Sequence, residues 1–236
     1  MAAAAKCIAL LLLAMAVGGT HAQSTTSTVS VPENTGEGGE RFNKDVRADL
    51  AKDQLDLANT FLYDQLYAQQ PPSDRKTVTS VSLVVANDID GAAKVDLESN
   101  TIFLSSDYIS GYEGNLVRDV FGIEFQGVAA IWQWTGNNQA PAWWFNGVAQ
   151  YFRLRVGFAP EGFAAPGSGD TWEEQQPPNG VTARFIEYLE TVTSGFVGKL
   201  NAKIKTSWDI GYFKNITGKP VKELWSDYKA ENGKGS

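Results

Sequence analysis

Cysteine and histidine are almost absent from this chain of 236 residues, which contains one of each, Cys7 and His21. A single cysteine cannot form a disulfide within the chain, so the fold has to rely on its hydrophobic core. Both residues precede Gln23, and a chain that starts there contains neither. Such a chain cannot build a histidine-based zinc site, a Ser-His-Asp triad or a Cys-His pair.

The N-terminal segment has the order of residues that is typical of a secretory signal peptide. Lys6 precedes an apolar run from Ile8 to Val17, and small residues and Thr20-His21-Ala22 follow before Gln23. We predict that residues 1–22 are a signal peptide and that the protein is secreted. The apolar run is too short to span a bilayer and no later run is long enough, so we expect no membrane span.

Positive charge is scarce as well. The chain has 20 Lys and Arg residues against 27 Asp and Glu residues, which gives a formal net charge of −7. Removal of the predicted signal peptide takes away Lys6 and makes the net charge more negative by one. We therefore expect neither nucleic acid nor an anionic membrane surface as a partner.

We predict one α/β domain in which a small sheet is followed by a mainly helical C-terminal half. Residues 23–40 are rich in Ser, Thr, Gly and Glu, a composition typical of a disordered leader. Residues 41–230 are expected to fold, and residues 231–236 to form a flexible tail. Alternating apolar residues predict a strand at 78–86, and two short strands are predicted at 93–97 and 101–105, joined at Ser99-Asn100. Apolar residues at helical spacing predict helices at 41–68, 117–132, 143–151, 181–191, 194–205 (with Ser194 as N-cap) and 220–228.

The central stretch, Val117–Tyr151, is predicted to form two helices joined by a loop that ends at Pro141. Two helices connected in this way can frame a site. The residues that would line it are Gln126, Gly127, Ala130, Asn146 and Gln150. None of these side chains is a strong metal ligand or a group for acid–base chemistry.

Short stretches that match one family are spread over nearly all of the predicted mature chain. They are Gly39–Phe42, Pro71–Lys76, Asp88–Gly91, Trp132–Trp134, Gly136–Pro141, Arg153–Leu154, Val181–Phe185 and Leu224–Lys229. On these stretches the sequence resembles the plant basic secretory protein family, which is grouped with pathogenesis-related proteins and whose members look like zinc-dependent peptidases. The resemblance implies a zincin-like, metallopeptidase-type fold.

The same resemblance implies a zinc site that this chain has lost. Family members carry H-E-x-x-H just before the W-Q-W signature, and the next helix carries E-G-x-A-D-Y. Alignment on W-Q-W places Gln126 and Ala130 at the two His positions, Gly127 at the general base, Asn146 at the third ligand, and Gln150 at the Asp that would orient a ligand His. Since these replacements offer no zinc ligand of normal strength, we expect no metal cofactor and no zinc-dependent catalysis.

The replacements remove charge but keep hydrogen-bonding groups, which suits a neutral groove that binds a ligand. The residues of this possible groove are Gln126, Asn146, Gln150, Trp134 and Trp143. The alternative is that the tryptophans are core residues and that the amides satisfy one another. The resemblance implies that the protein acts by binding a peptide, protein or glycan in plant defence, in the apoplast.

Two other functions stay open. The first is an active hydrolase, either a metallopeptidase or an enzyme that uses carboxylates, with Asp107, Glu113, Asp119 and Glu124 as the acids near the centre. For Glu124 we expect a partly buried side chain with a hydrogen-bonding partner. The second is a cell-wall or glycan-binding protein that uses its tryptophans.

A sequon for N-glycosylation occurs at Asn215-Ile216-Thr217. It lies between two predicted helices, where a surface position is expected. In an exported chain this motif predicts a glycan on Asn215.

Overall fold

The computed structural model describes residues 24–175 and 179–233. The predicted signal peptide, residues 1–22, and the last three residues of the predicted tail lie outside this range. Within it the chain forms one α/β domain with a small mixed sheet and many helices.

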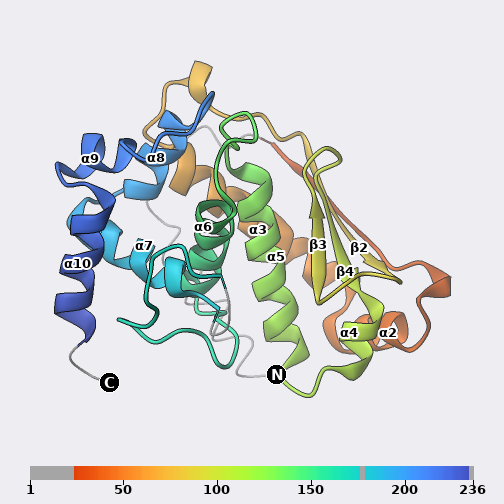
Figure 1. Cartoon of the computed structure of the whole chain (residues 1–236). Coiled ribbons are helices and arrows are strands. Elements are labelled where there is room, and N and C mark those ends of the chain that lie inside the picture. The colour runs from red at the N-terminus through yellow and green to blue at the C-terminus, as the bar shows by residue number, and fades with distance from the viewer. Residues whose placement is uncertain (1–23, 176–178, 234–236) are drawn as a thin grey trace.

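The elements follow the chain in this order: β1 (Thr26–Ser30), η1 (Glu33–Thr35), α2 (Gly36–Arg41), η2 (Phe42–Val46), α3 (Ala48–Tyr67), η3 (Pro72–Asp74), β2 (Ser80–Ala86), β3 (Ala93–Asp96), β4 (Thr101–Ser105), α4 (Ser106–Gly111), α5 (Leu116–Trp132), α6 (Ala142–Arg155), α7 (Val181–Val192), α8 (Phe196–Lys203), α9 (Tyr212–Thr217) and α10 (Val221–Asn232). Figure 1 shows the sheet on one side of the molecule and the C-terminal helices on the other, with α5 between them.

The sheet has four strands in the order β1-β2-β4-β3. The first three of these pair in parallel, whereas β3 pairs with β4 in an antiparallel direction and forms one edge of the sheet. Burial alternates along β1 and β2, because one face of these strands packs beneath helices and the other is more open to solvent. The helix-facing side chains of the two central strands are fully buried: Val81, Leu83, Val85, Ile102 and Leu104.

The prediction of a disordered leader is wrong for residues 24–40, which form β1, η1 and most of α2. Ser27 is buried and accepts a hydrogen bond from Asn59. The glycines that suggested disorder are needed for close packing. A Cβ on Gly38 would lie 2.1 Å from the backbone oxygen of Ser106, and one on Gly39 would lie 2.0 Å from the Thr35 hydroxyl.

The single helix predicted for residues 41–68 is interrupted. The interruption is at Arg47, whose φ of 72° lies in the left-handed region, and the long helix α3 starts only after it. A non-glycine residue rarely adopts this conformation, so the periodic pattern alone could not reveal the break.

The predicted strands and the central helices agree with the structure to within a few residues. Two short helices, α4 and α9, were not predicted. Ser194 is not the N-cap of α8, because that position belongs to Gly195 at φ 71°. The Glu190 carboxylate instead accepts hydrogen bonds from the backbone N–H groups of Gly195 and Val197. At the other end, α10 continues to Asn232, past the predicted start of the tail.

Candidate functional site

Helices α5 and α6 pack side by side and carry all five candidate residues. Helix α5 begins where the Asn115 side chain accepts a hydrogen bond from the Arg118 N–H, and α6 begins after Pro141. On α6, Gly147 permits a close approach of α7, because a Cβ there would lie 2.3 Å from Thr182 Cγ2. Helix α6 therefore packs closely against α7 at this point.

Four of the candidate residues lie in two pairs, one pair on each helix of the α5–α6 seam. Gln126 and Ala130 are one turn apart on α5, and Asn146 and Gln150 are one turn apart on α6. The side chain of Gln126 is half-buried and accepts a hydrogen bond of 3.4 Å from Arg153 Nη1 of α6. Asn146 is exposed and donates to Gln175 Oε1 at 3.2 Å. The seam is thus lined by neutral amides.

Gly127, at the predicted position of a lost general base, is buried against the sheet. A Cβ at this position would lie 2.5 Å from Cδ1 of Ile102, a fully buried residue of β4. Any side chain at 127 requires Ile102 to move. Glycine itself has no group that can take a proton from water.

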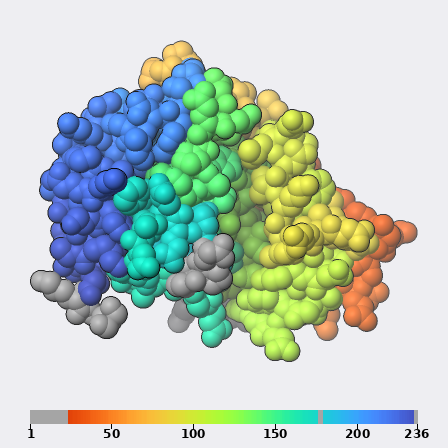
Figure 2. All heavy atoms as spheres, viewed as in Figure 1, coloured from red at the N-terminus to blue at the C-terminus, as the bar shows by residue number. Residues whose placement is uncertain are grey.

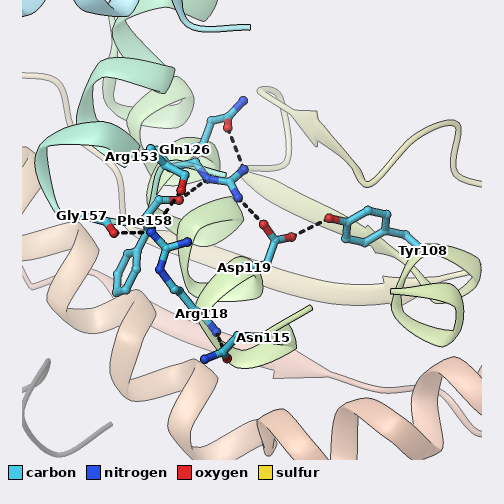
Figure 3. Close-up of polar contacts among 9 residues, drawn as sticks. Tyr108, Asn115, Arg118, Asp119, Gln126, Arg153, Gly157 and Phe158 are labelled. Carbon is cyan, nitrogen blue, oxygen red and sulfur yellow. Dashed lines mark hydrogen bonds and ion pairs between the residues drawn. The ribbon is translucent and has the colours of Figure 1, made fainter. Parts of the chain in front are cut away.

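A buried charge network lies farther down the same two helices (Figure 3). Asp119 Oδ1 accepts a hydrogen bond of 2.5 Å from Arg153 Nη2, and the two residues are 3% and 7% exposed. Tyr108 donates its hydroxyl to Asp119 Oδ2 at 2.6 Å, and Arg153 Nε donates to the Phe158 carbonyl at 2.9 Å. The network therefore pairs the charge of each buried ion.

The network needs a residue without a side chain at Gly122. A Cβ on Gly122 of α5 would lie 2.5 Å from Arg153 Nε. Burial, together with the hydrogen bond to the Asp119 carboxylate, raises the pKa of Tyr108, which stays a protonated donor. The sequence interpretation gave Asp119 no partner, although Asp119 and Gln126 are two helical turns apart and Arg153 is close to one turn beyond Gln150. This spacing is the signal that could have linked them.

Glu124 of α5 differs from the prediction. It is fully buried, and neither of its carboxylate oxygens has a hydrogen-bond partner among residues 24–175 and 179–233. Burial raises the pKa of Glu124 well above its usual value. Burial thus favours the neutral form of this carboxylic acid, which is enclosed in the core where no substrate can reach it. Of the other central acids, Asp107 and Glu113 are exposed.

The two tryptophans of the predicted groove lie elsewhere. Trp143 is 9% exposed and packs in an aromatic cluster, with ring centroids 5.7 Å from Trp208 and 6.2 Å from Phe213. The half-buried ring of Trp134 lies beneath the ammonium of Lys76, at 5.6 Å. Lys76 also donates to the carbonyls of Ile131 and Gln133 at the end of α5. Trp143 thus belongs to the core, and Trp134 stabilises the end of α5.

The surface is hollowed beside the seam. Figure 2 shows the hollow between β3, in yellow, and the cyan residues after α6, with green atoms between them. On the sheet side, Gly127 contacts Ile102, and Ile102 lies opposite Val95 of β3. The edge strand β3 and helix α5 therefore flank the same depression.

Among residues 24–175 and 179–233, no strand pairs with the outer edge of β3. The N–H of Ser105 in β4 donates to the carbonyl of Ala92 at 2.9 Å, and hydrogen-bonded pairs alternate along an antiparallel ladder. With the observed register, Lys94 and Asp96 turn their backbone groups toward β4, whereas Ala93 and Val95 turn theirs toward the free edge. The free edge thus presents main-chain donors and acceptors beside the hollow.

The residues at the seam do not fit a zinc ion. Gln126 and Asn146 offer neutral carbonyl oxygens, one of which already accepts from Arg153, and Ala130 offers no ligand atom. In the described parts of the chain, no group of three or more His, Cys, Asp or Glu side chains is arranged to hold a metal ion.

Asn215 lies on the short helix α9 and is exposed. It is therefore not in a connection between helices, as the sequence suggested, but its side chain is open to solvent. Glycosylation at this residue stays a prediction.

A family model described as "Peptidase of plants and bacteria" matches residues 25–228 of the chain. Comparison with curated proteins and with solved structures gave no match. Over residues 24–175 and 179–233, every helix is too short or too polar to cross a membrane.

Proposed function

The chain belongs to this family of peptidases of plants and bacteria, and from that membership we propose that it is a peptidase homologue that binds extended peptides without cleaving them. The observation that carries the proposal is the set of neutral groups at Gln126, Gly127, Ala130 and Asn146. A peptidase needs a group that activates water and a group that polarises the carbonyl. None of the side chains at these four positions can do either.

Peptide binding is supported by the free edge of β3 beside the hollow. An extended peptide can add to such an edge through main-chain hydrogen bonds, and this mode tolerates many sequences. The side chains that such a peptide turns toward α5 would meet the amides of the seam, which can both donate and accept. Ligand recognition of this kind needs no metal.

We also propose the cellular setting implied by the family resemblance. The signal-peptide pattern of residues 1–22 supports secretion into the apoplast, where a binding protein of this family would act in defence. The zincin-like fold is part of the same proposal. The glycan-binding alternative has less support, because Trp132 and Trp144 are almost completely buried and Trp143 belongs to the aromatic cluster.

The first test is a cleavage assay with the chain from Gln23 to Ser236. An unfolded protein substrate is incubated with added zinc and, separately, with a chelator, beside an active member of the family. We expect intact substrate in both tubes. Cleavage that the chelator abolishes would refute the proposal, because it would require a metal held by carboxylates.

The second test measures binding of a fluorescent, capped hexapeptide to wild type and to Val95→Pro. The Val95 N–H faces the free edge, so proline removes a donor to the ligand but no bond to β4. We expect Val95→Pro to abolish binding while circular dichroism shows an intact fold. Undiminished binding to this variant would place the peptide elsewhere.

A further inference from the structure

The solvent face of β3 carries two opposite charges. Lys94 and Asp96 are two residues apart on a strand, so both side chains point to the same face. That face is the one away from the helices, because the intervening Val95 lies opposite the buried Ile102. A strand that pairs with β3 can therefore place either opposite or like charges against Lys94 and Asp96.

Both charges are available to a ligand. The side chain of Lys94 is exposed and makes no hydrogen bond or ion pair within residues 24–175 and 179–233. Asp96 uses Oδ1 to accept from the backbone N–H groups of Glu98 and Ser99. These hydrogen bonds lower the pKa of Asp96, so that it stays ionised and its negative charge can meet a ligand.

The register of an added strand follows from the backbone. A ligand strand that pairs in an antiparallel direction makes its main-chain bonds opposite Ala93 and Val95. The positions opposite Lys94 and Asp96 are then non-hydrogen-bonded pairs, in which facing side chains are closest. Side chains of the ligand therefore interact most strongly with β3 at Lys94 and Asp96.

We propose that Lys94 and Asp96 select extended peptides that carry a basic residue and, two positions later, an acidic residue. Antiparallel pairing places the basic residue against Asp96 and the acidic residue against Lys94. The residue between them turns toward α5 and the amide-lined hollow. This inference rests on the proposed function, since it specifies which peptides the β3 edge binds.

The chain itself contains the matching order in Lys94-Val95-Asp96, which supplies the probe. Three capped hexapeptides are compared by fluorescence anisotropy: the sequence of residues 92–97, the same sequence with Lys and Asp exchanged, and one with both replaced by Gln and Asn. For wild type we expect the exchanged peptide to bind about tenfold more weakly than the matched one, with the neutral peptide between them. The difference should shrink at high salt, because the charges are exposed.

Two variants make the test specific. In Lys94→Glu, a peptide with Lys at both charged positions should become the best ligand, because the strand then presents two carboxylates to it. Lys222→Glu, at an exposed position on α10, changes the net charge equally and should leave the order of affinities unchanged. Asp96 is kept in both variants because it stabilises the turn after β3.

The outcomes separate the two proposals. If the peptides bind with equal affinity and Val95→Pro still abolishes binding, the charge selection is wrong and the proposed function stands. If none of the peptides binds, both are wrong. If the protein forms dimers that Lys94→Glu disrupts, the edge is occupied by a second copy, and selection of free peptides is refuted.

Discussion

The two ends of the α5–α6 seam differ in charge. At one end, Asp119 and Arg153 are both buried and charged, and each has its partner. At the other end, Gln126, Ala130 and Asn146 are all neutral. The same pair of helices thus holds ions where each has a partner and holds none at Gln126, Ala130 and Asn146.

The difference in charge between the two ends has a simple physical basis. A buried ion is tolerated when a counter-ion and hydrogen bonds replace its water shell. Neutral amides do not carry that cost, so Gln126 and Asn146 need no counter-ion. Gln126 even joins the two ends, because its carbonyl accepts from Arg153.

The largest effect is predicted for a substitution at the charged end of the seam, Arg153→Met. In Arg153→Met, the Asp119 carboxylate stays buried without its counter-ion, so we expect a loss of about 3–5 kcal/mol in the free energy of unfolding. Denaturant titration measures it. The matched control is Arg155→Met, an exposed residue of the same helix that donates to the Tyr151 hydroxyl. Similar small losses in both variants would mean that the buried pair contributes little.

The next prediction concerns Glu124, a buried acid on α5 whose carboxylate oxygens have no partner among residues 24–175 and 179–233. Glu124→Leu removes two unsatisfied oxygens, so we expect it to stabilise the protein by about 1–3 kcal/mol at pH 7. The folded-state pKa of Glu124 is raised, so the unfolded chain releases this proton first as pH rises. Wild-type stability is therefore fully present below the unfolded pKa of about 4.3 and decreases as pH rises toward the folded pKa.

The gain from Glu124→Leu should accordingly be larger at pH 7 than at pH 4, which thermal denaturation at the two pH values can measure. Glu113→Leu, at an exposed position just before the same helix, should show no such pH dependence. A gain that is constant with pH would show that Glu124 is not protonated in the folded state.

The smallest effect on stability is expected at the neutral end. Gln150 is half-buried and makes no side-chain hydrogen bond to residues 24–175 or 179–233, so Gln150→Ala should change the unfolding free energy by less than about 0.5 kcal/mol. Peptide affinity should fall several-fold in the same variant. Gln69→Ala, at an exposed position just after α3, serves as control for both measurements. A large loss of stability in Gln150→Ala would mean that the neutral end is structural, not a binding surface.

Local patterns predicted much of the fold. Alternation located β2 with Val81, Leu83 and Val85 on the buried face, and helical spacing located α5 and α6. The order of strands in the sheet was not predictable, because β1 pairs with a strand far along the chain. The break at Arg47 depends on a backbone angle that no periodic pattern encodes.

The candidate site was predicted in part. Spacing along two helices brought Gln126 and Asn146 to one seam, since residues one turn apart share a face. The ion pair of Arg153 with Asp119 was not predicted, because Arg153 was noted only as part of a motif. Glu124 was expected to have a hydrogen-bonding partner, and the described part of the chain provides none. Burial and pairing across elements depend on the tertiary arrangement, and Trp143 was assigned to a groove for the same reason.

The pairing of β1 with β2 sets the order in which the chain can fold. The hydroxyl of Thr28 donates to that of Ser82, a partner 54 positions later, and all of α3 lies between them. During synthesis β1 therefore has no strand to pair with until β2 has been made. Bringing the two strands together closes a long loop that includes α3, and this step is slow. A shortened chain that began at Arg41 would leave one side of β2 permanently open to other chains.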